Sequence, residues 1–121
     1  MSGAVFHGMR PWALDAGIIE CTGTALGVVD LHNDADVLEV VITTGRTVRL
    51  RFSHTAGGRA FALVFTGVSR FHAARLDHHP DDAALFHDLS HVPVEGGSDC
   101  EITLAALRLE LRAAGVEFSV D

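Results

Sequence analysis

The sequence predicts a mainly β fold, either a β-sandwich or a curled antiparallel sheet, with one short helix at about residues 80–91. Several short runs alternate apolar and polar residues with the period of two that a half-buried strand requires. Residues 46–53 show it best, since Val48, Leu50 and Phe52 lie on one side. Turns rich in glycine separate the runs at near-regular spacing. At 121 residues the chain is long enough for one hydrophobic core, so residues 1–121 are predicted to form a single domain.

The strands follow in order along the first two thirds of the chain. The expected ranges are 17–23, 26–31, 36–43, 46–53, 59–66 and 68–76. Residues 32–34, His-Asn-Asp, are typical of a turn, because Asn and Asp accept local backbone hydrogen bonds. Thr44-Gly45 and Gly57-Gly58 predict two tight turns. Both faces of residues 36–43 are largely apolar, which predicts a central strand that is covered on both sides.

Three features predict the helix at residues 80–91: residues that suit its first turn, a proline that ends it, and an apolar stripe at helical spacing. Pro80 suits a first helical position, and Asp81 and Asp82 follow where the helix dipole favours negative charge. Pro93 ends the pattern. An apolar stripe at helical spacing is formed by Leu85, Phe86 and Leu89.

Residues 101–112 fit two patterns. Leu104, Leu107 and Leu111 match one face of a helix, whereas residues 107–111 alternate as a strand. We favour a strand, with a bulge at Ala105-Ala106, because residues 116–120 alternate directly after a short connection. The two runs would then form a closing hairpin, and the helix remains the alternative.

The charges are sorted along the chain. Residues 45–76 contain six arginines and no acid, whereas the rest has three arginines and all sixteen acids, for a net charge of −7 overall. Such an acidic chain argues against nucleic-acid binding, which needs clustered positive charge. Arg49 and Arg51 share the outward face of one predicted strand. They form either a surface for an anion or partner, or cross-strand pairs with Glu39 or Glu110.

Other features of the chain indicate a cytoplasmic protein. No apolar run approaches the ~20 residues that span a bilayer, and residues 1–10 do not resemble a signal peptide, so no membrane association is expected. Cys21 and Cys100 form no CxxC motif, and we expect two buried thiols. A disulfide between them is the alternative, if the fold brings them close together.

The histidines suggest a metal site as an alternative to a plain polar surface. His87 and His91 stand at i and i+4 on the predicted helix, a spacing that puts two imidazoles on one face. With His78 or His79 they form a candidate site for Zn²⁺ or Ni²⁺, although His87 and His91 lie opposite the apolar stripe and no third ligand has a known spacing. We therefore expect a polar helix face and no bound cofactor.

No catalytic residue is predicted. The acid pairs Asp34/Asp36 and Asp81/Asp82 suit a turn and a helix N-terminus. The nucleophile and phosphate-binding motifs GxSxG, P-loop and GxGxxG are absent from the sequence, and neither cysteine has a basic neighbour.

The segment over residues 30–76 resembles known small domains. Asp30-Leu31-His32-Asn33-Asp34 is followed by "ADVLEVVI", "TVRLRF" and "LVFTGVSRF". This order of a His-Asp turn, hairpins and an apolar-Gly-Val strand is similar to small bacterial β-rich domains that include immunity proteins of polymorphic toxin systems. The resemblance implies a cytoplasmic module that plugs a toxin without catalysis, and an acidic chain suits a basic toxin such as a nuclease.

We therefore expect a non-catalytic protein-interaction module, with a protein partner or a second copy of the chain as its binding partner. One alternative is a small metal-binding protein or metal-dependent enzyme that uses the helix histidines. Another is a structural subunit of a homo-oligomer, held together through an uncovered sheet edge.

Overall fold

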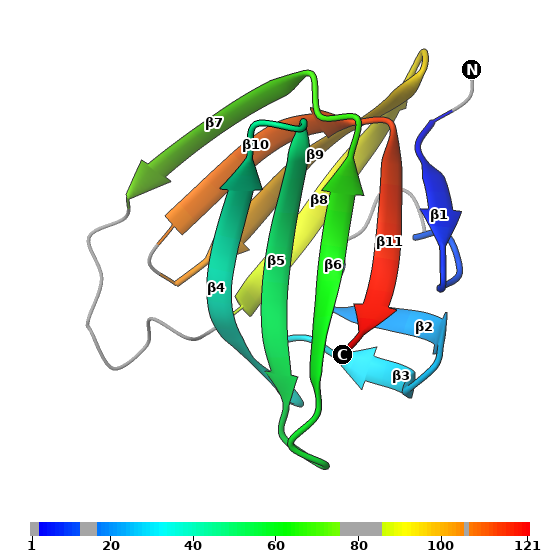
Figure 1. Ribbon diagram of the computed structural model, residues 1–121, viewed down its shortest axis with the longest axis vertical. Helices are drawn as coiled ribbons and strands as arrows, with labels where there is room; N and C mark the ends of the chain where they lie inside the picture. Colours follow the sequence, from blue (N-terminus) through cyan, green and yellow to red (C-terminus); the bar gives the residue numbers. More distant parts are fainter. Residues whose placement is uncertain (1–2, 13–16, 76–85, 106) are drawn as a thin grey trace.

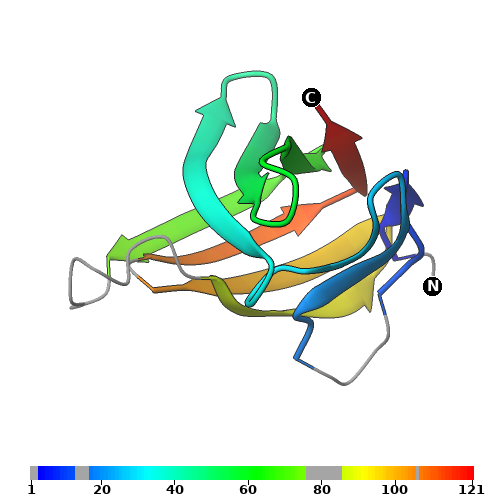
Figure 2. The same cartoon turned by 90° about the horizontal axis from the view of Figure 1, so that it is seen from below.

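A computed structural model describes residues 3–12, 17–75, 86–105 and 107–121, which form two facing β-sheets and one separate hairpin (Figure 1). Figure 2 shows the sheets as the two layers of a sandwich. The mainly β prediction is confirmed. The alternating side chains of the strands explain the arrangement, because each sheet turns its apolar face toward the other.

The first sheet has five strands in the order β1-β11-β6-β5-β4. β1 runs parallel to β11, and the other neighbours are antiparallel. In chain order its strands are β1 (Val5–His7), β4 (Ala35–Thr43), β5 (Thr47–His54), β6 (Ala60–Thr66) and β11 (Gly115–Val120). We refer to it as sheet A.

The second sheet, sheet B, has four antiparallel strands in the order β7-β10-β9-β8. These are β7 (Arg70–Arg75), β8 (Phe86–Val94), β9 (Gly97–Leu104) and β10 (Leu107–Ala113). The chain enters sheet B after β6 and returns to sheet A after β10, so every strand of sheet B comes from the second half of the chain, whereas sheet A contains strands from both halves.

A short hairpin of β2 (Glu20–Thr24) and β3 (Gly27–Asp30) lies at the end of the sandwich where β11 ends (Figure 1). Cys21, Val29 and Leu31 are fully buried, so the hairpin closes this end of the core. The turn after it is as predicted. The Asp30 carboxylate accepts hydrogen bonds from the Asn33 side-chain amide and from the backbone N–H of Asn33 and His32, each at 2.9 Å. The bond from the Asn33 side chain, supported by the two backbone bonds, lowers the pKa of Asp30 below its usual range.

The core between the sheets is rich in aromatic side chains. Phe52, Phe61 and Phe118 come from three neighbouring strands of sheet A and stack in sequence, with ring centroids 5.0 Å and 4.9 Å apart. Phe86 of sheet B meets Phe52 edge-on. At the β1 side, Trp12 fills the core against Phe6 and Phe65. A single buried cluster joins both sheets and the hairpin.

The predicted helix at residues 80–91 is wrong where the structure describes it. Residues 76–85 lie outside the described residues, and residues 86–91 belong to β8. The register of β8 shifts between Phe86 and Asp88, so His87 is an extra residue in a bulge. Phe86 and Leu89 therefore both point inward although they are three residues apart. A bulge of this kind reproduces the i, i+3 spacing of a helix, which explains the error.

The prediction of extended structure over residues 101–112 is confirmed, but the predicted hairpin with residues 116–120 is wrong. Residues 101–104 and 107–112 lie in two strands, β9 and β10, which pair as a hairpin. The expected bulge at Ala105-Ala106 falls between the two strands, and Ala106 lies outside the described residues. β10 and β11 do not pair with each other, because β11 crosses to sheet A and lies between β1 and β6.

β4 lies at an edge of sheet A, so the prediction of a central strand is also wrong. A second bulge lies in this strand between Val37 and Glu39. Leu38, the extra residue, is 51% exposed, and Ile42 near the end of the strand is 58% exposed. The apolar residues on both faces therefore reflect an uncovered edge and not a strand buried on both sides.

Candidate functional site

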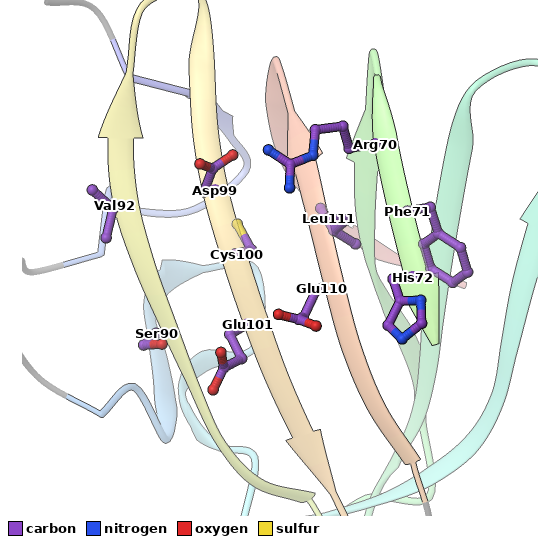
Figure 3. A pocket seen from close by; sticks show the side chains of 10 residues that line it. All are labelled: Arg70, Phe71, His72, Ser90, Val92, Asp99, Cys100, Glu101, Glu110 and Leu111. Carbon is purple, nitrogen blue, oxygen red and sulfur yellow. The ribbon is translucent and has the colours of Figure 1, made fainter. Parts of the chain in front are cut away.

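An open depression of about 700 Å³ lies on the outer face of sheet B (Figure 3). Its floor is made of strands, so the side chains that line it start from a rigid backbone. The polar and charged residues that line it are Arg70, His72, Ser90, Asp99, Glu101 and Glu110. They come from all four strands of the sheet.

Strand register explains how these side chains meet. Directly opposite residues on neighbouring strands share a face of the sheet. The pairings Ser90–Glu101, Glu101–Glu110 and Glu110–His72 therefore form one row across the sheet. Two residues further along, Asp99 and Arg70 belong to the next row on the same face. The depression is thus crossed by two rows of ionisable side chains.

The first row sets two carboxylates against each other. Glu101 and Glu110 are directly opposite on β9 and β10, and like charges in this position repel. Arg108 forms an ion pair with Glu101 at 2.7 Å, which compensates one of the two charges. Within the described part of the chain, no ion pair is made by Glu110, an exposed residue whose cross-strand neighbour on the other side is His72. Glu110 is therefore a negative charge available to a partner.

In the second row, the negative charge of Asp99 is compensated by the positive charge of Arg112. Arg112 donates two hydrogen bonds to the Asp99 carboxylate, from Nε at 2.6 Å and from an Nη at 3.0 Å, and this fork-like geometry is the strongest form of an arginine–carboxylate pair. These hydrogen bonds lower the pKa of Asp99 below its usual range, and the charges of Arg112 and Arg70 act in the same direction. Asp99 is consequently held ionised beside the depression.

The lowered pKa of Asp99 predicts a small pH dependence of stability. The folded state favours the ionised carboxylate, so its contribution is present above the unfolded-state pKa of about 4 and is lost as the pH falls through the lower folded-state pKa. Asp99→Asn should therefore reduce the fall in melting temperature between pH 7 and pH 3 by about 1–3 °C, since the pair is exposed and screened. Thermal unfolding followed by circular dichroism measures it. Asp88→Asn, on the same face without a described ion pair, is the control, and an equal reduction in both variants would contradict the assignment.

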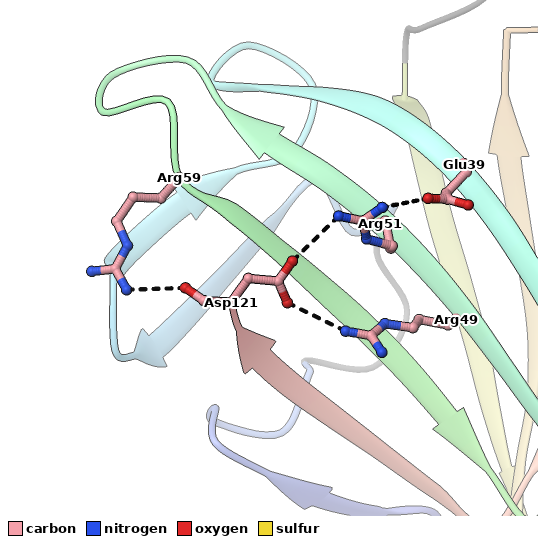
Figure 4. Close-up of polar contacts among 5 residues, drawn as sticks. All are labelled: Glu39, Arg49, Arg51, Arg59 and Asp121. Atoms are coloured by element: carbon pink, nitrogen blue, oxygen red, sulfur yellow. Dashed lines mark hydrogen bonds and ion pairs between the residues drawn. The ribbon is translucent and has the colours of Figure 1, made fainter.

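The outer face of sheet A carries the two arginines that the sequence singled out (Figure 4). Arg51 forms an ion pair with Glu39 on β4, which is one of the two cross-strand pairings that the sequence predicted. Arg49 and Arg51 also each lie 3.3 Å from a different oxygen of the Asp121 carboxylate, a residue that the sequence did not implicate. Glu110 lies on sheet B, so the alternative pairing with it does not occur.

Arg49 and Arg51 therefore lie among acids and not in an open cationic patch. Glu39 and Asp121 together provide two carboxylates for two guanidinium groups. A role for Arg49 and Arg51 in binding an anion or partner stays a prediction. It would require the partner to replace Asp121.

The histidine candidates for a metal site do not share a face. His91 is buried on the inner side of β8 and packs edge-on against Trp12, with ring centroids 5.7 Å apart. His87 is exposed at the bulge, where its ring lies 6.0 Å from that of His32. His78 and His79 lie outside the described residues. Among the residues that the structure does describe, no group of three or more His, Cys, Asp or Glu side chains is arranged to hold a metal ion.

The two cysteines are free and buried, as expected. Burial raises the pKa of Cys21 and that of Cys100 to about 12, so both remain protonated thiols at neutral pH. A protonated, buried thiol is a poor nucleophile. Burial therefore leaves neither thiol activated for nucleophilic attack.

The residues of the depression were not identified from the sequence. A weak signal exists in the alternation of Arg108, Glu110 and Arg112, which places three charges on one face of β10. Their neighbours on β9 lie in the preceding strand of the same hairpin, whereas those on β7, such as His72, are distant in sequence. Only the order of strands in sheet B shows that they converge.

Comparisons of the chain with protein-family models, with curated proteins and with solved structures found no match. Within the described residues, no helix has the length and apolar character needed to cross a membrane.

Proposed function

We propose that this chain is a non-catalytic protein-interaction module, of the kind that immunity proteins of toxin systems represent, and that it acts in the cytoplasm. The outer face of sheet B is the proposed binding surface. The observation that carries the proposal is the open depression on this face, crossed by two rows of charged side chains that neighbouring strands hold in place. Charges that are carried on a rigid sheet favour specific recognition of another protein, because their backbone positions need no ordering on binding.

The charges of this face indicate the character of the partner. Glu110 is exposed and is opposed by Glu101, so a cation between them would relieve the repulsion of the two carboxylates. A lysine or arginine on the partner supplies such a cation, and arginine is favoured because its planar fork binds carboxylates through two hydrogen bonds. The net charge of −7 would also steer a basic partner toward the chain. A basic toxin such as a nuclease is consistent with these features by analogy.

Glu110→Arg tests this surface. The candidate partner is the product of the neighbouring gene, co-expressed with this chain and purified as a complex, and its affinity is measured by isothermal titration calorimetry. Reversing the charge of Glu110 should weaken binding by at least about tenfold, because a like charge then faces the basic residue of the partner. Higher salt should weaken the wild-type complex and affect the Glu110→Arg complex less.

Glu117→Arg is the matched control, since Glu117 is an exposed glutamate on the outer face of sheet A. It should bind the partner with the affinity of the wild type. If Glu110→Arg binds as tightly as the wild type, the partner does not use sheet B. If both variants lose affinity equally, only the overall charge matters and the proposed surface is wrong.

A further inference from the structure

β4 is an edge strand of nine residues, and one side of its backbone has no neighbouring strand in the described structure. In Figure 1 it forms the outer side of the front sheet, at the opposite edge from β1. An edge strand presents unpaired N–H and C=O groups, which are a template for another strand. The edge of β4 is apolar as well, because Leu38 and Ile42 are both more than half exposed.

The sandwich is also open beside this edge. Ile42 lies directly opposite Val48, which is 1% exposed, so both side chains point toward the interior. Ile42 is nevertheless 58% exposed, which shows that sheet B does not cover the end of β4. Phe71 on β7 belongs to the row of Leu111 and Cys100 on the inner face of sheet B, and it too is only partly buried. A second chain at this edge would therefore cover apolar surface in addition to pairing with the backbone.

We propose that two copies of this chain associate through antiparallel pairing of their β4 strands about a twofold axis at Val41. The two five-stranded sheets A would become one continuous sheet across the dimer. The regular part of the strand, from Glu39 to Thr43, follows the bulge and provides the pairing segment. In this register Val40 lies opposite Ile42 of the second copy, and Glu39 lies opposite Thr43, so no like charges meet.

The charges at the two ends of β4 are complementary in this arrangement. Asp36 near the start of the strand is exposed, and so is Arg46 in the turn after its end. Within the described residues, neither is in an ion pair. Arg46 Nε donates a hydrogen bond at 3.1 Å to the carbonyl of Val68, a residue that follows β6, and the Nη groups of Arg46 have no partner among the described residues. Antiparallel pairing brings Asp36 of each copy toward Arg46 of the other. A second copy of the chain therefore fits this edge better than an arbitrary strand does.

Analytical ultracentrifugation of the full chain over a range of concentrations tests the proposal. The mass should rise with concentration and reach a plateau at twice the monomer mass of 12.9 kDa, because a twofold interface closes. Ile42→Lys should weaken dimerisation by at least about tenfold, since lysine is a common protection of natural sheet edges. Val28→Lys is the matched control, because Val28 on β3 is 62% exposed and lies away from the edge. It should leave the dimer unchanged.

A charge exchange provides an independent test at positions outside the pairing segment. Asp36→Arg and Arg46→Asp should each weaken the dimer, and the double variant should restore it. Arg46 has a φ of 64°, and aspartate tolerates this left-handed conformation, so the Arg46→Asp chain should fold, as circular dichroism would verify.

Three results would overturn the proposal: a wild-type monomer at every concentration, a mass that grows without a plateau, or a dimer that neither Ile42→Lys nor the single charge variants weaken. Glu110→Arg should leave the dimer intact, which separates this inference from the partner surface on sheet B.

Discussion

Replacing Phe61 with alanine should lower the free energy of unfolding by about 3–5 kcal/mol, as is typical when a large buried aromatic side chain is truncated. Phe61 is fully buried and is the middle of three stacked rings. The planes of Phe52 and Phe61 differ by 11°, and those of Phe61 and Phe118 by 17°. Alanine would remove both ring contacts and leave a cavity beneath the centre of sheet A, where surrounding strands restrict its collapse.

Urea unfolding followed by circular dichroism measures this effect. Phe61→Leu keeps most of the volume and should cost clearly less than Phe61→Ala. Val64→Ala is a second control on the same strand, because Val64 points to the outer face of sheet A and is only partly buried. A loss from Phe61→Ala no larger than that from Val64→Ala would show that the aromatic stack does not stabilise the sandwich.

Replacing Gly97 with alanine should destabilise the protein by about 2–3 kcal/mol, for a reason unrelated to core volume. Gly97 is buried at the start of β9, where a Cβ atom would overlap the carbonyl oxygen of Ala113 and lie 3.1 Å from its carbonyl carbon. Both atoms belong to the backbone, so no side-chain rotation relieves the overlap. β10 ends at Ala113, and the chain then crosses to sheet A, so a shift here would disturb the link between the sheets.

Gly57→Ala is the matched control for Gly97→Ala. Gly57 is exposed, its φ is not left-handed, and a Cβ atom there would meet no atom within 4 Å. This substitution should change the free energy of unfolding by less than about 1 kcal/mol, and a slight gain is expected from the lower entropy of the unfolded chain. Equal losses for the two variants, measured by the same urea titration, would contradict the close approach of β9 and β10.

The errors in predicting the elements have a common physical origin. In β8 the bulge at His87 spaces Phe86 and Leu89 like residues of a helix, and in β4 the bulge at Leu38 leaves apolar residues on both faces. Both bulges lie on edge strands, where such irregularities are frequent. The period-two pattern therefore predicts the regular inner strands β5 and β6 well and fails where an edge strand gains an extra residue.

The candidate surfaces were predictable to different degrees. Arg51 and Glu39 lie on strands joined by a tight turn, so their pairing followed from local register. Asp121 lies more than sixty positions from Arg51, and no local pattern connects them. The same holds for His72 and Glu110, which become neighbours because β7 and β10 pair across 38 positions of sequence. Sequence patterns report such contacts poorly because they describe neighbours along the chain.

The mainly β class of this protein, and the positions of most of its inner strands and turns, were predictable from the amino-acid sequence. These features follow from side-chain alternation and turn residues, which act over a few positions. Three features were visible only in the folded chain: β7 pairs in sheet B and not beside β6, β11 inserts between β1 and β6, and β4 lies at an uncovered edge. These outcomes depend on which strands pair across long stretches of chain and on how two apolar faces bury each other. The same long-range pairing assembles the charged face of sheet B and leaves open the edge through which we expect two chains to associate.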